Sequence, residues 1–524
     1  GLDASFLYLE PPTSHMHVGS VAVLDGALTF NEFKEFLASR IHLSPKLRQR
    51  LIEVPLSIDY PYWVDDPNFD INVHLQHLAL PRPGGWRELR AMASQIFSKP
   101  LDRSRPLWEF SFIEGLDTVA QVPSGSVAII TKMHHASIDG MAGADLLSTL
   151  FDMTPEPRKV EPAPPWNPKP LPNELLVATK SAISFAKKPL KLPGLVKDTV
   201  AATVKAGYLT RIQNLELPTA PFTAPTTPLN GIVSAQRKWN SALLSLERIK
   251  KLKNIMGTTV NDVMLAICSG ALRRYLIEKN KLPSKPLVAM IPVSVRTRDQ
   301  QSSGGNQVSN MLIQLGTQIE DPIGRLEQIH ENANRGKMYQ GAIGAQTLAK
   351  MAEVVPFGLA NQATRLYSRY QLSSMHNPVF NVVITNVPGP QFPLYMNGRR
   401  LLAFMGMAPI IDGMGLIITI LSYNGVVSVS PTSDIKTMPD IDIFTRYIRE
   451  SANELEALIL EMEEKRQEEA ESTAVAESDA LFEHMGQYFQ DNPEFLRPGA
   501  GLFQFDITGP AAGHWHINLN EAPG

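Results

Sequence analysis

The chain has 524 residues, a hydrophobic fraction of 44% and a formal net charge of -3 at neutral pH. Such a length exceeds what one hydrophobic core usually supports, so two or three domains are expected, and the near-neutral charge gives no reason to expect nucleic acid as a partner. The single cysteine, Cys268, excludes an intrachain disulfide framework and suits a reducing compartment. It lies in an apolar helical pattern, which predicts a buried, inert thiol.

Residues 1–152 alternate strand-like and helical patterns and predict a first lobe. Near its end, the short β-branched run at 126–130 leads into two adjacent histidines, His134 and His135, and a helix is expected to begin near Gly140. The histidines therefore lie at a strand-to-helix connection. An imidazole with a pKa of roughly 6.5 can take a proton from a hydroxyl near neutral pH, which points to base-catalysed acyl transfer.

The roles within this cluster differ. His135 is the expected catalyst, whereas His134 taken alone fits a packed or hydrogen-bonded neighbour and Asp139 fits a structural anion. A metal site built from these three side chains is a poor alternative, because adjacent histidines point apart on a strand and no further ligand lies near them in sequence. We therefore expect no metal.

Residues 153–231 form the expected connector between two lobes. Prolines occur at 155, 157, 162, 164, 165, 168, 170 and 172, which forbids regular ladders and favours an extended link. Residues 174–211 follow with an excess of lysine and interleaved apolar side chains. This pattern suits contact with an anionic membrane or lipid surface, and the alternative is a solvated helical linker.

Residues 232–465 predict a second lobe with buried-strand runs at 287–293, 380–387 and 416–421. The long apolar stretch 402–421 is interrupted by proline, aspartate and glycines, so we expect two buried strands there and no membrane span. Asn261 and Asp262 follow Thr259 at a helix start, where Thr259 and Asp262 have capping-box spacing. The fold class expected from this succession is α/β, bilobal and sandwich-like.

Beyond the second lobe, residues 466–478 read as an acidic spacer after an exposed helix. In residues 479–524 a helix-like segment precedes two alternating apolar and polar runs with a turn between them, which predicts two strands. A helix and two strands cannot protect their own edges or close a cavity. This tail would therefore be truncated or completed by another chain.

The segment 134–140 resembles the HHxxxDG signature of bacterial wax ester synthase/diacylglycerol acyltransferases, members of the CoA-dependent acyltransferase superfamily. Further matches in the expected order extend the resemblance to about residue 465; they are Met16-His17-Val18-Gly19, Pro106-Leu107-Trp108, Asn261-Asp262, Pro292-Val293-Ser294-Val295-Arg296, Asn386-Val387-Pro388-Gly389-Pro390 and Ser422-Tyr423-Asn424-Gly425. The resemblance implies two chloramphenicol acetyltransferase-like lobes with a tunnel between them. The tail resembles the start of a sterol carrier protein type 2 domain.

The resemblance also implies roles for individual residues. His135 is the general base, with His134, Asp139 and Gly140 completing the motif, and Asp139 is structural, with Arg296 as its expected partner. Asn261 and Asp262 are expected near the tunnel, where Asn261 is a candidate for the oxyanion or substrate, with helix capping as the alternative. Pro106-Leu107-Trp108 and Asn386-Val387-Pro388-Gly389-Pro390 are expected to be structural, one a buried indole and the other a turn after a strand.

The implied activity is O-acyl transfer from acyl-CoA to diacylglycerol or a long-chain fatty alcohol, without an acyl-enzyme. No permanently bound cofactor is expected, and acyl-CoA is a co-substrate. We expect a cytoplasmic protein in peripheral contact with the inner face of the plasma membrane or with lipid inclusions. Two alternatives stay open: an acyltransferase of the same superfamily with another hydroxyl acceptor, and a non-catalytic lipid-binding or lipid-transfer protein.

Overall fold

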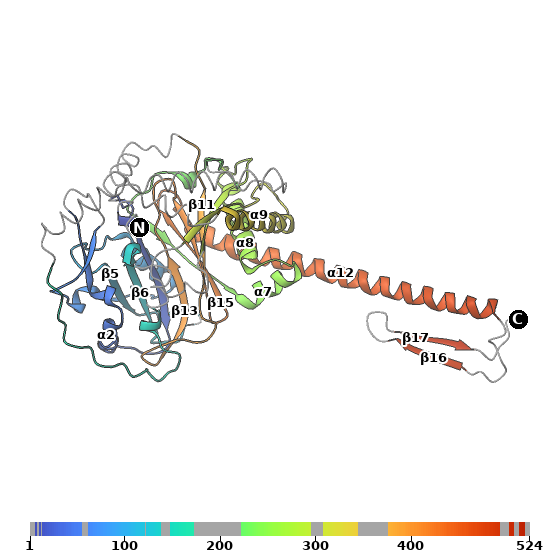
Figure 1. Ribbon diagram of the computed structural model, residues 1–524, viewed down its shortest axis with the longest axis horizontal. Coiled ribbons are helices and arrows are strands. Elements are labelled where there is room, and N and C mark those ends of the chain that lie inside the picture. The colour runs from blue at the N-terminus through green and yellow to red at the C-terminus, as the bar shows by residue number, and fades with distance from the viewer. Residues whose placement is uncertain are drawn as a thin grey trace. The chain divides into compact units, whose positions relative to one another are not determined.

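The computed structural model describes residues 6–7, 10–11, 13–54, 61–120, 122–137, 147–171, 219, 222–294, 308–343, 376–492, 502–507 and 513–518. The chain divides into two compact units (Figure 1). The larger unit comprises Gly1–Asn254 and Thr258–Asn453, so it contains the first expected lobe and most of the second. The smaller unit comprises Ile255–Gly257 and Glu454–Gly524.

Among the described residues, the larger unit combines helices with two large sheets and a small one formed by β2 (Gln49–Ile52) and β3 (Tyr62–Asp65). Besides short helical pieces at 6–7 and 147–150, the α-helices of the described chain are α2 (Phe30–Ala38), α3 (Trp86–Ser98), α7 (Leu246–Ile255), α8 (Val260–Glu278), α9 (Pro322–Ile343) and α12 (Ile441–Asp491). The strands are β1 (His17–Leu24), β2 (Gln49–Ile52), β3 (Tyr62–Asp65), β4 (Leu75–Ala79), β5 (Trp108–Glu114), β6 (Val127–His134), β7 (Arg237–Trp239), β8 (Ala242–Ser245), β9 (Val288–Ser294), β10 (Val308–Gln314), β11 (Val382–Pro388), β12 (Tyr395–Met396), β13 (Arg399–Met407), β14 (Leu416–Tyr423), β15 (Val426–Asp434), β16 (Leu502–Ile507) and β17 (Gly513–Asn518). The α/β class expected from the sequence is confirmed.

The first sheet carries the histidine motif. Its strand order is β12-β13-β1-β6-β5-β4, in which β6 lies between β1 and β5. Every residue of β6 is buried, as its β-branched run requires. The antiparallel pairing of β1 with β6 sets His17 opposite His134. The start of β1 and the end of β6, which carry the two histidine motifs, therefore lie next to each other although they are far apart in sequence.

The second sheet has the order β10-β9-β11-β14-β15-β7, and β8 also pairs with β15. Its strands β9, β11 and β14 coincide with the three buried-strand runs expected in the second half of the chain. The long apolar stretch forms two strands, β13 and β14, as its internal proline and glycines indicated. Among the described residues no single helix is long and apolar enough to cross a membrane; α7 and α8 pass such a test only together, with a bend of 103° between them.

Strands β12 and β13 belong to the second half of the sequence but pair into the first sheet. β13 runs antiparallel to β1, with Gly19 opposite Met407 and Val21 opposite Met405. A bridge between Asp152 and Tyr395 adds a further link at this edge. The division into lobes at 1–152 and 232–465 stays a prediction, and the pairing shows that residues 395–407 serve the first sheet.

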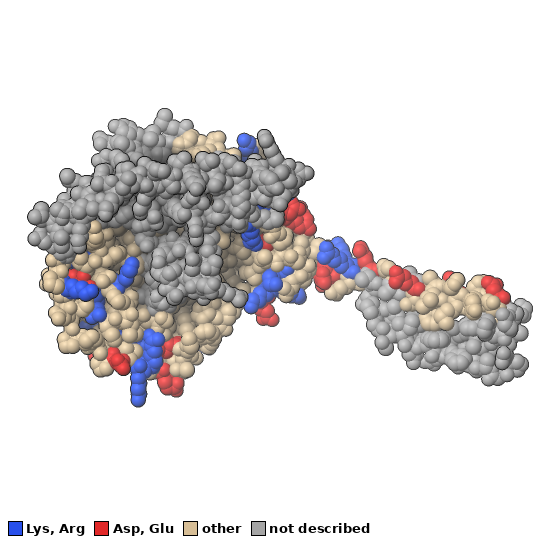
Figure 2. Space-filling model, viewed as in Figure 1, with Lys and Arg blue, Asp and Glu red and all other residues tan. Residues whose placement is uncertain are grey.

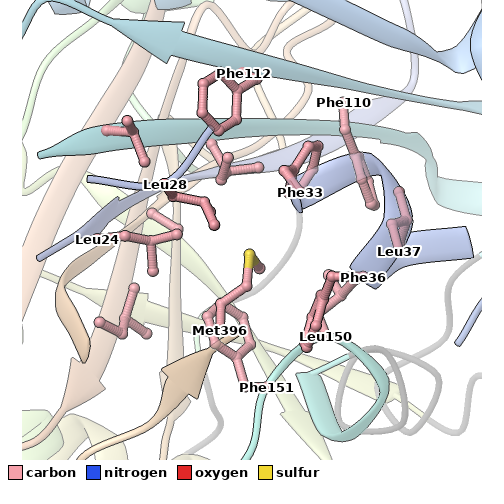
Figure 3. Packing of buried hydrophobic residues seen from close by; sticks show 14 of the residues in the cluster. Leu24, Leu28, Phe33, Phe36, Leu37, Phe110, Phe112, Leu150, Phe151 and Met396 are labelled. Carbon is pink, nitrogen blue, oxygen red and sulfur yellow. The ribbon is translucent and has the colours of Figure 1, made fainter. Parts of the chain in front are cut away.

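Two hydrophobic clusters cover the faces of the first sheet. In one, aromatic residues of α2 and β5 surround Met396 of β12, whose side chain points into the middle of the cluster (Figure 3). Helix α2 begins at a capping box formed by Thr29 and Glu32. In the other cluster, α3 packs Leu89, Ala93 and Phe97 against β1 and β6. β12 and β13 thus help to build the core of the first sheet.

The connector follows the surface of the first lobe without regular structure across 154–171. Trp166 anchors it, because its Nε1 donates to the Asp66 carbonyl at 2.9 Å and the Arg48 guanidinium lies 4.1 Å from its ring centroid. The proline-rich residues therefore form neither helix nor strand, and their role as a connector between two lobes stays a prediction. The basic segment 174–211 lies outside the described residues.

Helix α12 is continuous through the acidic residues 466–478. Its surface carries both signs of charge, as Figure 2 shows, and pairs such as Glu461 with Lys465, 2.7 Å apart, support the exposed helix. In the smaller unit, β16 and β17 form the expected antiparallel pair, with Phe503 opposite Ile517 and Phe505 opposite Trp515. The proposed resemblance of this tail to a sterol carrier domain stays a prediction.

We predict that Gly19→Ala destabilises the first sheet. A Cβ at position 19 would lie 2.2 Å from the Thr131 carbonyl oxygen, so β1 and β6 would have to separate. The free energy of unfolding, measured in urea, should fall by about 1–3 kcal/mol, as is usual for overpacking.

Gly231→Ala is the matched control, because the nearest atom to its added Cβ is 3.6 Å away and its φ is an ordinary -76°. It should leave stability within about 0.5 kcal/mol of the parent. An equally small effect of Gly19→Ala would contradict the close packing of the two strands.

Candidate active site

The end of β6 and a 3₁₀ turn, His135–Ser137, position the two motif histidines. The His134 amide donates to the Leu107 carbonyl at 3.0 Å, and the His135 amide donates to the Met16 carbonyl at 2.8 Å. The Ser137 hydroxyl donates back to the His134 carbonyl at 2.7 Å. The turn is therefore held between the end of β6 and the segment that precedes β1.

His134 has both ring nitrogens engaged. Its Nδ1 lies 3.1 Å from the Ala136 amide, which donates to it, and its Nε2 lies 3.1 Å from Glu10 Oε2. A nitrogen that accepts a hydrogen bond carries no proton, so Nε2 holds the hydrogen and donates it to Glu10. Both ring nitrogens are thus occupied in the way that a hydrogen-bonded neighbour of the catalyst requires, and the part of His134 in catalysis stays a prediction.

His135 is in a different environment. Its ring stacks on Phe6 with centroids 3.8 Å apart and planes inclined by 18°, and its Nδ1 is buried without a hydrogen-bond partner among the described residues. Burial lowers the pKa of His135 to about 4, with a smaller contribution from the neighbouring His134. The imidazole is neutral at pH 7 and so has a lone pair available.

Glu10 lies at the centre of a group of basic side chains. Besides His134, its carboxylate is 3.7 Å from both His15 Nδ1 and His17 Nε2 and forms an ion pair with Arg103. Burial alone would raise the pKa of Glu10, but the hydrogen bonds from His134 and His15 and the nearby positive charges hold it well below its usual range. The carboxylate is ionised at neutral pH.

Two further buried basic residues, His17 and Lys132, lie near the motif histidines. Burial lowers the pKa of His17 to about 2, so its ring is neutral. Lys132, on β6 two residues before His134, is fully buried; its ammonium lies 3.1 Å from Glu109 and donates to the carbonyls of Ile96 and Lys99 at 3.2 and 3.3 Å. These carbonyls belong to the C-terminal turn of α3, where a cation is favourable. Lys132 thus fastens α3 to β6.

Asn261 and Asp262 lie at the start of α8. Thr259 and Asp262 form the expected capping box, and Asp262 Oδ2 is also 2.8 Å from His330 Nδ1 of α9. Asn386 donates to Asn261 Oδ1 at 3.3 Å. Asn386 itself lies within β11, which continues to Pro388, so it precedes the turn expected in the Asn386–Pro390 motif. The capping prediction is confirmed, while an oxyanion or substrate role for Asn261 stays a prediction.

The remaining residues singled out from the sequence are only partly covered by the described structure. Asp139, Gly140 and Arg296 lie outside the described residues, so the expected pairing of Asp139 with Arg296 stays a prediction. Trp108 is buried, and its Nε1 donates to the Leu47 carbonyl at 2.8 Å, as expected of a structural indole. Cys268 is fully buried, and burial raises the pKa of its thiol to about 12, which confirms an inert thiol.

Sequence reasoning missed Glu10, Phe6 and Arg103, and it assigned no role to His17. The signal available for His17 was its place in the Met16-His17-Val18-Gly19 motif. Glu10 and Arg103 lie in segments without a recognisable spacing, and they meet only because the chain before β1 folds over the end of β6.

Comparison with known proteins shows which family the chain belongs to. Residues 1–264 match the model of the wax ester synthase/diacylglycerol acyltransferase catalytic domain, and residues 304–456 match the C-terminal domain model of that family. The chain belongs to this family. It is an O-acyltransferase, and the family resemblance stated from the HHxxxDG motif is confirmed.

Relatives cover most of the chain. A Mycobacterium tuberculosis protein provisionally named diacylglycerol O-acyltransferase is 37% identical over 447 residues, which are 84% of this chain and 86% of the relative. A second protein of that species with the same provisional activity, tgs2, is 34% identical over 465 residues, 87% of this chain and 98% of the relative. The solved wax ester synthase/diacylglycerol acyltransferase of Marinobacter aquaeolei VT8 aligns with a TM-score of 0.63 at 26% identity, covering 87% of this chain and 98% of that one.

We predict that the acid limb of kcat/KM lies near pH 4 to 5 and not near the ordinary histidine value of about 6.5. His135 has a lowered pKa of about 4, so its neutral, proton-accepting form persists as the pH falls to that value. The profile should be measured between pH 4 and 8 with short assays.

The fold must be followed by circular dichroism over the same range. Neutral, buried His17 and His135 take up protons on unfolding below about pH 6.5, so stability declines as the pH falls. An acid limb near 6.5 in protein that is still folded would show that His135 titrates normally.

Proposed function

We propose that this acyltransferase moves a long-chain acyl group from acyl-CoA to the free hydroxyl of diacylglycerol or to a long-chain fatty alcohol, with His135 as general base. The observation that supports this most directly is the neutral His135 imidazole, whose Nδ1 has no partner among the described residues. The family supplies the reaction class. The names of the relatives favour diacylglycerol as the acceptor.

In the proposed reaction, His135 takes the hydroxyl proton while the hydroxyl oxygen attacks the thioester carbonyl carbon. A new carbon–oxygen bond forms, the tetrahedral intermediate collapses and the carbon–sulfur bond breaks. The imidazolium then gives its proton to the leaving CoA thiolate, so the enzyme returns to its starting state. No acyl-enzyme is needed, and the inert thiol of Cys268 has no part in the reaction.

We predict that His135→Ala abolishes acceptor-dependent release of free CoA from palmitoyl-CoA. Loss of a general base should cost roughly a hundredfold to ten-thousandfold in kcat. His77→Ala is the matched control, because His77 is a half-exposed histidine on β4 beside Glu114 and outside the site. Hexadecanol and dipalmitoylglycerol, compared at equal concentration, give the preferred acceptor.

A folded His135→Ala protein that keeps most of the parental rate would refute the general-base role. Parent protein that binds palmitoyl-CoA but releases no CoA with either acceptor would indicate another hydroxyl acceptor or a lipid carrier.

We also propose that the basic segment 174–211 brings the enzyme to an anionic lipid surface, such as the inner face of the plasma membrane or a lipid inclusion, from the cytoplasmic side. The support is its sequence: lysines interleaved with leucine, valine and phenylalanine. Water-insoluble acceptors have to be collected from such a surface.

We predict that replacing Lys187, Lys188 and Lys191 together by Gln weakens sedimentation with phosphatidylglycerol vesicles at least about tenfold, since each surface lysine contributes on the order of 1 kcal/mol. The control replaces three exposed lysines of the described chain, Lys250, Lys251 and Lys281, by Gln. Equal binding by both triple variants would contradict a specific role for the segment.

A further inference from the structure

The residue that stands out after the motif has been accounted for is Glu10. It lies 124 positions from His134 in sequence, yet its carboxylate contacts the Nε2 of that histidine. Its side chain is only 9% exposed. A buried carboxylate is costly unless its oxygens are fully partnered. Here Oε1 accepts from the Met16 amide at 3.2 Å, and Oε2 accepts from His134 and Arg103.

This contact fixes the chemical form of His134. Because the Ala136 amide donates to Nδ1, the ring hydrogen must be on Nε2, where the Glu10 carboxylate accepts it. Carboxylate, imidazole and main-chain amide thus form one hydrogen-bonded series. Its last member, Ala136, is the residue that follows His135 in the 3₁₀ turn.

Glu10 also holds the other side of the same turn. Met16, whose amide donates to Glu10, accepts the His135 amide through its own carbonyl. The main chain of His135 is therefore tied to Glu10 by two routes, one through His134 and Ala136 and the other through Met16. A small displacement of a catalytic group from its productive position is enough to slow a reaction severely.

We infer that Glu10 is a positioning residue for acyl transfer: it selects the Nε2–H form of His134 and, through Ala136 and Met16, holds the turn that presents the His135 imidazole. This inference rests on the proposed function, in which His135 is the base. In this role Glu10 acts through His134 and the Met16 amide.

Two substitutions separate the charge of Glu10 from its shape. Glu10→Gln keeps the volume and one acceptor oxygen, so it can serve either His134 or the Met16 amide but not both. Glu10→Ala removes both acceptors. Glu53→Gln is the matched control, because Glu53 is another partner of Arg103, at 3.6 Å, but its side chain is 74% exposed.

The measurement is kcat and KM for palmitoyl-CoA and for the acceptor that the parent protein prefers. Glu10→Ala should lower kcat by about tenfold to a hundredfold with both KM values within about twofold, because loss of a charged hydrogen-bond acceptor acts on the geometry of the base. Glu10→Gln should fall between this variant and the parent, and Glu53→Gln should match the parent.

A second measurement reads His134 directly. In protein labelled with 15N-histidine, the His134 ring, assigned by its disappearance in His134→Gln, should give the Nε2–H pattern in the parent and a mixture of the two neutral forms in Glu10→Ala. If Glu10→Ala fails to fold, Glu10→Gln provides both readouts.

A kcat for folded Glu10→Ala within twofold of the parent would overturn the inference, as would a rise in KM with unchanged kcat or an unchanged His134 ring pattern. Failure of the proposed function has a different signature. In that case the parent shows no transfer, or His135→Ala stays active, while the 15N pattern of His134 still responds to Glu10.

Discussion

The geometry of the candidate active site depends on one pairing, that of β13 with β1. β1 is the strand that sets His17 opposite His134, and its other edge is covered by β13, which the chain supplies nearly 400 residues later. Without β13, β1 would be an edge strand with unpaired amides and carbonyls. The position of the histidines is therefore a property of the whole larger unit and not of the N-terminal lobe alone.

Several buried polar contacts hold this crossover in place. Arg40, two residues beyond α2, makes two hydrogen bonds to the Asp152 carboxylate at 2.9 and 2.7 Å, and the main chain of Asp152 pairs with Tyr395 of β12. Removing one member of such a buried pair usually costs about 3–5 kcal/mol, because the other charge is left without its partner. On the other face, Trp239 donates to the Gly406 carbonyl at 2.9 Å. Both ends of the inserted segment are thus fixed by groups from distant parts of the chain.

The sequence predicted what depends on local pattern. Buried β-branched runs identified β6, β9, β11 and β14, and the spacing of Thr259 and Asp262 identified the cap of α8, because a strand's burial and a helix's first turn are determined by residues a few positions apart. The contiguous motif also identified the family and made His135 the candidate base, a role that stays a prediction. Alternating or apolar runs do not encode which strand pairs with which, so the insertion of β13 beside β1 was not predictable from them.

The contacts missed in the site have the same cause. Glu10 meets His134 across 124 residues, and Asn261 meets Asn386 across 125. A single carboxylate or amide without a characteristic neighbour spacing carries no signal of such a partner. Once the strand pairing is known, however, a buried glutamate beside three histidines is recognisable, because a buried charge requires partners.

Adjacent histidines in one motif acquire different chemistry from their surroundings. His134 accepts the Ala136 amide on Nδ1 and donates from Nε2 to Glu10, whereas the Nδ1 of His135 has no hydrogen-bond partner among the described residues. The low pKa of His135 comes mainly from burial, which makes its protonated form more acidic than an ordinary imidazolium. In the proposed reaction such an imidazole accepts a proton less strongly than an ordinary histidine, but it is neutral at physiological pH and returns the proton readily. Acyl transfer to a thiolate leaving group needs that return in every cycle, because the proton taken from the hydroxyl must leave with CoA.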